Sequence, residues 1–299
     1  MTNEPIYSFA ALRNRLTING VLEAQTALRV GAGRDLAVLG NDLPVLRDGR
    51  GNPLIPGASL KGAFRARLEA LVRSVHSDQA RDLLEIEEHM RWLLDWRERD
   101  QEFLRVRREE GPVAADRAFS QQAWTTSTLI DLTFGSPWSA GRIFFRDALV
   151  DPTLWFGQFE VRNGVGIDRD TETVAQSLLY NYEVVPAGMR FGFALTLENA
   201  APWQIGMVLL GLEPWQRGEA QIGGFRSRGL GYLQLLGPDD SSEPAVSFIE
   251  VRTPDDVIAL LEDRPGQHPA SKEQRQAWRE AFVAVLRDPK EAHKELGNA

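Results

Sequence analysis

The sequence LIPGASLKGAFRARLEALVRS, residues 54–74, predicts an amphipathic helix. Ser59 is placed to cap this helix with its hydroxyl. The predicted apolar face has the spacing i, i+4, i+8 and i+11: Leu60, Phe64, Leu68 and Leu71. The same helix is strongly basic, with Lys61, Arg65, Arg67 and Arg73.

The flanking sequence predicts strands on both sides of this helix. Residues 15–30 alternate apolar with other side chains, as a strand does, and residues 31–53 are rich in Gly, Asp, Asn and Pro, as a long loop is. The remaining expected elements are strands at 141–149, 189–197 and 246–251, helices at 203–213, 253–263 and 271–287, and a glycine-rich loop running into a strand at 223–236. Strand–helix–strand, repeated once, predicts an α+β fold of the ferredoxin-like kind with long insertions.

The composition excludes several classes of site. The 299 residues include no cysteine, which excludes disulfides, thiolate zinc sites, iron–sulfur clusters and a cysteine nucleophile. The four histidines lie far apart without zinc-ligand spacing. No apolar run reaches the ~18 residues that a membrane span needs, and the first residues lack a secretory pattern. We therefore expect a cytoplasmic protein with no membrane partner.

The charge is distributed unevenly along the chain. The net charge of −8 argues against a nucleic-acid binder, but residues 1–75 hold 10 basic and 6 acidic side chains. Only four of the 34 basic residues are lysines, and the planar fork of arginine suits phosphate. A genomic base composition that favours arginine codons would explain the same excess.

The sharpest local motif is GGFRSRGLG, residues 223–231. Glycines let backbone N–H groups approach an anion, and arginines supply forks for phosphate. The motif is neither a Walker loop nor a dinucleotide fingerprint, because it lacks the terminal Gly-Lys-Ser/Thr and leads into a strand. It predicts either a phosphate-binding loop or a tight turn with solvated arginines.

Two further features could carry chemistry. PGASLKG, residues 56–62, could bind an anion at a helix N-terminus, or could simply be a helix start. In the long loop, Asp35, Asp42 and Asp48 could each be a general base, a divalent-metal ligand or a turn residue.

Four blocks in this order resemble the RAMP superfamily of CRISPR-associated proteins, most closely the backbone (seven-family) subunits of type III effector complexes. They are NDLPVLRDGRGNPLIPGASLKGAFRARLEAL (41–71), FGSPWSAGRIFFRDA (134–148), GVGIDRDTETVA (164–175) with YNYEVVPAGMRFGF (180–193), and GGFRSRGLG (223–231).

The resemblance implies a ferredoxin-like palm formed by residues 1–76 and 124–237, with a thumb hairpin at about 158–185. It leaves residues 77–123 as a helical insertion and 238–299 as a C-terminal strand and helical extension. It also implies the partners: a guide (CRISPR) RNA, a target RNA and other subunits of an antiviral ribonucleoprotein.

Roles for individual residues follow from the resemblance alone. Asp42 takes the position of the aspartate that cuts target RNA. The guide-RNA contacts implied are Ser59, Lys61, Arg65, Gly223, Gly224, Arg226, Arg228, Gly229 and Gly231. The thumb residues implied are Val165, Ile167, Asp168 and Arg169. Cutting would use a transiently bound divalent ion, Mg²⁺ or Mn²⁺, for which Asp42 is the candidate ligand; no organic cofactor is expected.

Alternative functions stay open at this point. The chain could be a structural RNA-binding subunit of the same complex that does not cut. A guide-processing endoribonuclease is disfavoured, because such enzymes usually use histidine and none falls in the matched blocks. A monomeric enzyme acting on small phosphate ligands would also use the glycine-rich loop.

Overall fold

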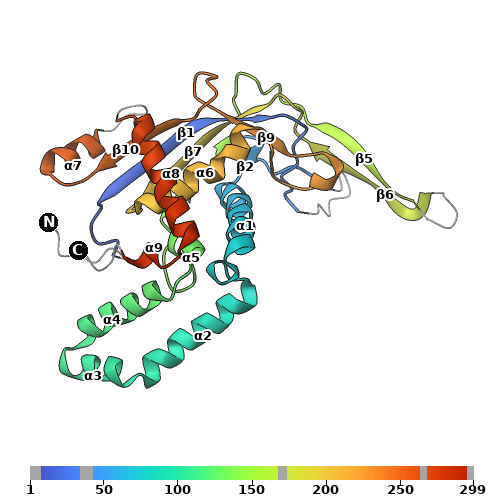
Figure 1. Ribbon diagram of the computed structural model, residues 1–299. Coiled ribbons are helices and arrows are strands. Elements are labelled where there is room, and N and C mark those ends of the chain that lie inside the picture. The colour runs from blue at the N-terminus through green and yellow to red at the C-terminus, as the bar shows by residue number, and fades with distance from the viewer. Residues whose placement is uncertain (1–7, 34–42, 168–173, 263–267, 295–299) are drawn as a thin grey trace.

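The computed structural model describes residues 8–33, 43–167, 174–262 and 268–294. Its centre is one antiparallel sheet, built from β1 (Asn14–Ala24), β3 (Ile143–Phe145), β7 (Arg190–Glu198), β8 (Ala220–Gln221), β9 (Tyr232–Leu236) and β10 (Ala245–Glu250). The strand order is β3-β7-β1-β9-β8, and β10 also pairs with β1 (Figure 1). The predicted α+β class is confirmed, since helices are combined with an antiparallel sheet.

The central strand, β1, pairs with two different strands along one of its edges. Its first half pairs with β10, from Asn14 to Asn19, and its second half pairs with β9, from Val21 to Ala24. Gly20 stands between the two, where a Cβ atom would lie 2.4 Å from the carbonyl oxygen of Leu236. Only glycine lets the two partner strands meet there.

Two helices cover one face of this sheet, α1 (Gly57–Val75) and α6 (Pro202–Gln216). Phe64 of α1 lies at the centre of their contact, with its ring 6.2 Å from that of Trp215 in α6 and 5.7 Å from that of Phe145. α8 (Lys272–Arg287) packs on α6 from outside, and Gly206 allows this, since a Cβ there would lie 1.9 Å from the Trp278 carbonyl oxygen.

The start and register of α1 differ from the prediction. The helix begins at Gly57, after Pro56, so Ser59 lies inside the first turn and does not cap it. The cap comes from elsewhere: the Asp147 carboxylate accepts a 2.7 Å hydrogen bond from the Gly57 N–H. Val72, not Leu71, completes the buried face: Leu60, Phe64, Leu68 and Val72 recur at intervals of four residues, whereas Leu71 is 46% exposed.

The strand predicted at 141–149 is two strands with different partners. β3 joins the main sheet beside β7, whereas β4 (Ala148–Leu149) pairs with β2 (Leu54–Ile55). Asp147 lies between them, and its bond to Gly57 turns the chain away from the sheet toward the start of α1.

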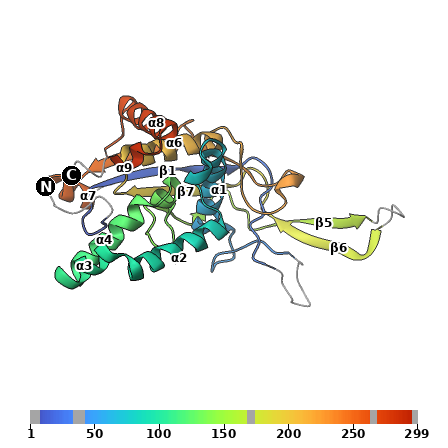
Figure 2. The same cartoon turned by 60° about the horizontal axis from the view of Figure 1, so that its bottom comes forward.

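A second sheet consists of β5 (Glu160–Ile167) and β6 (Val174–Val184), which form a long antiparallel hairpin. The hairpin projects away from the body, so its outer part has no core to pack against (Figures 1 and 2). Hydropathy patterning alone predicted no element in this stretch, whereas the family resemblance implied a thumb hairpin at about 158–185.

The helical insertion extends from the body on another side (Figure 2). It consists of η1 (Ser77–Gln79), α2 (Leu83–Arg99), α3 (Gln101–Glu109) and α4 (Pro112–Thr125), and is followed by α5 (Leu129–Phe134). The chain then closes with α7 (Pro254–Leu261), α8 and α9 (Glu291–Lys294).

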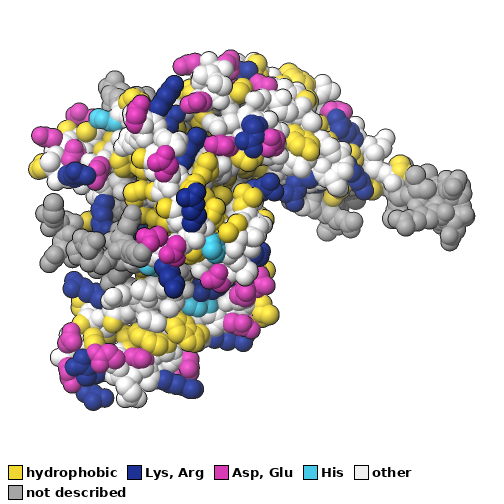
Figure 3. Space-filling view, in the orientation of Figure 1, with side chains coloured by type: hydrophobic (Ala, Val, Ile, Leu, Met, Phe, Trp, Pro, Cys, Tyr) yellow, Lys and Arg dark blue, Asp and Glu magenta, His cyan; other side chains and the backbone are white. Residues whose placement is uncertain are grey.

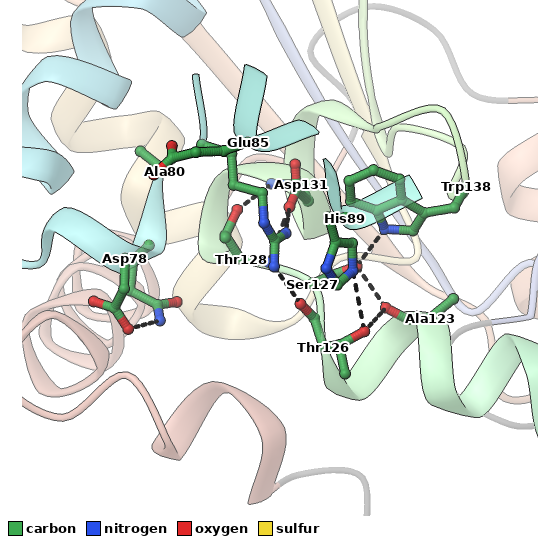
Figure 4. Close-up of polar contacts among 12 residues, drawn as sticks. Asp78, Ala80, Glu85, His89, Ala123, Thr126, Ser127, Thr128, Asp131 and Trp138 are labelled. Carbon is green, nitrogen blue, oxygen red and sulfur yellow. Dashed lines mark hydrogen bonds and ion pairs between the residues drawn. The ribbon is translucent and has the colours of Figure 1, made fainter. Parts of the chain in front are cut away.

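A buried polar network fastens the insertion to the body (Figure 4). Asp131 of α5 is 1% exposed, and its carboxylate lies 2.5 Å from Nη1 of Arg81, just before α2. Arg81 also donates to the Thr126 carbonyl oxygen at 2.8 Å. His89 of α2 lies against the ring of Trp138 at 4.6 Å, and burial lowers the pKa of this imidazole to about 4.

Within the described ranges, no helix has both the length and the apolar character that crossing a membrane requires.

Candidate nucleic-acid interface

The glycine-rich loop is pressed onto the segment that follows β1. Gly224 donates to the Arg29 carbonyl oxygen at 2.8 Å, and Gly231 donates to that of Ala27 at 2.9 Å. Gly223 has φ +86°, and a Cβ there would lie 2.1 Å from the Arg29 carbonyl oxygen. Both the left-handed conformation and the close approach therefore require glycine at this position.

The two arginines of this loop point outward. Arg226 and Arg228 are exposed and bracket a single 3-10 turn, and no carboxylate of the described part of the chain pairs with either guanidinium. Gly229 follows with φ +86° and with no atom within 4 Å of its missing Cβ. The turn thus offers two uncompensated positive charges over open space, which suits an anionic polymer.

Phe225 joins this loop to the base of the hairpin. Its ring lies 4.6 Å from that of Tyr182 and stacks on Tyr180 at 6.4 Å, both residues of β6. Arg228 lies over the same ring at 5.1 Å and donates from Nη1 to the Tyr180 hydroxyl at 2.8 Å. Phe225 has φ +58°, which is unusual for a bulky side chain, so this packing holds a strained backbone in place.

Basic side chains also mark this region on the surface. Figure 3 shows Lys and Arg side chains where the hairpin leaves the body, whereas both signs are mixed over the rest of that face.

The catalytic candidate Asp42 lies outside the described residues, as does Asp35. The residues that follow Asp42 are fixed to β6: Leu43 accepts from the Glu183 N–H at 3.1 Å. The Glu183 carboxylate accepts from the Val45 N–H at 3.1 Å and pairs with Arg47 at 2.7 Å. The chain therefore leaves the undescribed stretch directly beside the hairpin base.

Asp48 is a turn residue, which was one of the three roles that the sequence left open for it. Its carboxylate accepts from the N–H groups of Asn52 at 2.9 Å and Arg50 at 2.8 Å. These hydrogen bonds, the one from Asn52 above all, lower the pKa of Asp48 below its ordinary value. Both N–H groups bind the same oxygen, Oδ1, and this arrangement makes Asp48 the residue that shapes the turn.

The basic residues of α1 have partners inside the protein. Lys61 donates to the Ile143 carbonyl oxygen at 3.3 Å, and burial, with Arg65 nearby, lowers the pKa of this amine. Arg65 pairs with Glu69 at 2.7 Å and donates to the Gly135 carbonyl oxygen at 3.1 Å. Ser59 is half-buried in the first helical turn.

At the start of α1, where the sequence suggested an anion site, the Asp147 carboxylate of the chain itself accepts the hydrogen bond of the Gly57 N–H. The α1 side chain that approaches the glycine-rich loop is a different one: Arg67 and Arg226 line a common groove of ≈ 400 Å³ with Ala63, Ala66 and Ala70.

The hairpin candidates are only partly described. Val165 lies near the outer end of β5 and is 46% exposed, as an apolar wedge would be. Ile167 is the last residue of β5, and its backbone pairs with Val174. Asp168 and Arg169 lie outside the described residues.

Within the described ranges, no three histidine, aspartate or glutamate side chains are grouped so that they could hold a metal ion. The described residues alone therefore do not form a divalent-ion site, and the expected binding of Mg²⁺ or Mn²⁺ depends on Asp42.

Sequence reasoning missed four residues of this interface: Arg29, Tyr180, Tyr182 and Phe225. The alternation of YNYEV gave a usable signal, because it places Tyr180 and Tyr182 on one face of a strand. Nothing in the sequence indicated that Arg29 comes against Gly224 and Phe225, because that contact joins segments nearly two hundred residues apart.

Comparison with known proteins gives two matches. The family model described as RAMP superfamily matches residues 21–234. A curated relative, the CRISPR system Cms endoribonuclease Csm3 of Methanocaldococcus jannaschii, is 42% identical over 59 residues, which is 19% of this chain and 24% of the relative. The match thus spans about a quarter of the length of that relative.

Proposed function

The chain belongs to the RAMP superfamily, and from this premise we propose that it is a guide-RNA-binding backbone subunit of a type III CRISPR ribonucleoprotein that also cleaves bound target RNA. One observation carries the proposal. Arg226 and Arg228 are exposed, lack a carboxylate partner among the described residues, and lie at the base of a projecting hairpin.

The topology supports a ferredoxin-like palm. Taken in chain order, β1, α1, β3, β7, α6 and β9 follow the β-α-β-β-α-β sequence, and their sheet order β3-β7-β1-β9 is that of the ferredoxin-like sheet. In this proposal residues 1–76 and 124–237 make up the palm, with β5 and β6 as the thumb. Residues 77–123 are the helical insertion, and 238–299 are the C-terminal extension.

The electrostatics support RNA as the ligand despite the net charge of −8. A polyanion needs a local basic surface, not a basic protein. The loop arginines provide that surface, and aromatic side chains beside them suit unstacked bases. Phosphate contacts of this kind position an RNA without reading its sequence, as a subunit that accepts any guide must do.

Cleavage would use the nucleophile that RNA itself carries. The 2′-oxygen attacks the adjacent phosphorus, the bond from phosphorus to the 5′-oxygen breaks, and a 2′,3′-cyclic phosphate and a 5′-hydroxyl result. Asp42 would take the proton of the 2′-hydroxyl, and a proton from water would neutralise the leaving oxygen. A hairpin that splays the duplex at one base step favours the in-line geometry that this attack needs.

The requirement for a divalent ion, Mg²⁺ or Mn²⁺, is a separate part of the proposal. Such an ion would stabilise charge on the phosphate when bound, and Asp42 is the side chain that would hold it.

Purification of the chain together with the products of its neighbouring genes tests the proposal. We expect a short RNA of uniform length to co-purify, and the assembled particle to cut a complementary RNA. A particle that contains no RNA, or a chain that stays monomeric beside those proteins, would overturn it. A particle that contains guide RNA but does not cut the target would show that the chain is a structural, non-cleaving subunit.

A further inference from the structure

Arg29 is a buried arginine beside the glycine-rich loop. Its side chain is 9% exposed, and its Nε has no hydrogen-bond partner. No carboxylate of the described residues pairs with its guanidinium. Burial lowers the pKa of this group below its ordinary value, and only the hydroxyls of Tyr180 and Tyr182 act against that shift.

Two other arginines of this fold, in contrast to Arg29, have hydrogen-bond or ion-pair partners among the described residues. Arg142 is 1% exposed, but its Nη1 donates to the Asn199 carbonyl oxygen. Arg47, in the same region as Arg29, pairs with the Glu183 carboxylate at 2.7 Å. A buried charge without a partner is costly, so its retention at one position points to a partner beyond the described residues.

Two glycines lie against the guanidinium of Arg29. A Cβ on Gly31 would lie 3.0 Å from both terminal nitrogens, and a Cβ on Gly224 would lie 3.1 Å from Nη1. The Phe225 ring lies 5.3 Å from the Arg29 Cζ on another side. Glycine at both positions leaves room beside the terminal nitrogens, which any other residue would crowd.

We propose that Arg29 is a phosphate-binding residue, and that its missing partner is a phosphodiester of single-stranded RNA passing between the glycine-rich loop and the hairpin base. The proposal rests on the proposed RNA-binding function and adds to it a contact deeper than the surface arginines. RNA is favoured over an acidic peptide because the neighbours are arginine, tyrosine and phenylalanine, the combination that takes phosphates and stacked bases together.

Two variants test this in the full-length chain, with a labelled oligouridine as the probe. Arg29→Gln removes the uncompensated charge, so we expect an unchanged or higher melting temperature of the free protein. RNA affinity should fall about tenfold, and the slope of log K against log salt should shrink by ~0.7. Gly224→Ala keeps the charge but crowds it, and should weaken binding without lowering the melting temperature.

Arg47→Gln is the matched control, because it strips a partner from the buried Glu183 and should lower the melting temperature. If Arg29→Gln lowers the melting temperature as Arg47→Gln does, Arg29 has a partner within the chain and the proposal is wrong. The proposal also fails if both Arg29→Gln and Gly224→Ala bind RNA with wild-type affinity and slope, while Arg226→Ala weakens binding. A wild-type chain without salt-dependent RNA binding would instead overturn the proposed function itself.

Discussion

Nη1 of Arg228 donates a 2.8 Å hydrogen bond to the hydroxyl of Tyr180, and this bond ties the glycine-rich loop to the projecting hairpin. The two residues come from segments that pair in no common sheet. Because the Phe225 ring fills the space between them, loop and hairpin base form one unit. A ligand held by the loop therefore has a fixed position relative to the hairpin.

The first prediction separates charge from packing at this contact. Arg228→Ala should weaken binding to all RNA sequences alike and reduce the salt slope by ~0.7, because one phosphate contact is lost. Tyr180→Phe keeps both the guanidinium and the ring, so the salt slope should stay unchanged. Fluorescence anisotropy over a salt series measures both. Arg252→Ala is the control, since Arg252 is exposed and paired with Glu250; a loss confined to some sequences would indicate base reading.

The second prediction concerns the cutting residue. Asp42→Asn should leave guide and target binding within a few-fold but abolish cleavage at the site of this subunit, because amide cannot accept the proton as carboxylate does. Chelation of divalent ions should have the same effect on the wild-type particle. Denaturing gels of a labelled target show both. Cleavage at unchanged positions by Asp42→Asn, but not by Asp35→Asn, would move the role to Asp35.

The third prediction concerns the hairpin. Removal of residues 164–176 should leave the main sheet folded, because β5 and β6 pair only with each other within their own sheet. The cut positions or yields on a long target should change, since the apolar end near Val165 no longer splays the duplex. Circular dichroism checks the fold, and sequencing of the products maps the cuts. An unchanged cutting pattern would place the wedge elsewhere.

The fourth prediction uses His89. Its pKa is about 4 in the folded chain and about 6.5 when unfolded, so the unfolded state binds the extra proton between these values. The stability contribution is therefore complete above pH 6.5 and is lost as the pH falls toward 4.

At pH 5 we expect a loss of about 1 kcal/mol, reduced from the full linkage value because the ring is only partly buried. His89→Gln should show a smaller fall in melting temperature between pH 7.5 and pH 5 than the wild type does. Equal falls in the two proteins would assign the acid sensitivity to other groups.

Local patterns predicted the elements whose packing is repetitive, and failed where distant segments decide the structure. Helix α1 was predictable because Leu60, Phe64 and Leu68 recur at the helical period. Its cap was not, since Asp147 lies ninety residues away in sequence. The strands β5 and β6 could not be predicted from patterning, because a projecting ribbon buries little and shows no apolar alternation; only the family resemblance implied a hairpin there. At the candidate site, glycines and exposed arginines could be read from the motif, whereas the burial of Arg29 arises only from tertiary contacts.

The divided edge of β1 also has a consequence for synthesis. Asn14–Asn19 emerge from the ribosome early, but their partner strand β10 (Ala245–Glu250) emerges last among the strands. Until then half of one edge of β1 offers unpaired N–H and C=O groups, the kind of edge to which another nascent chain can add. The extension after Gly237 therefore completes the sheet. Chains that terminate before it would form an aggregation-prone intermediate and would not form a smaller functional palm.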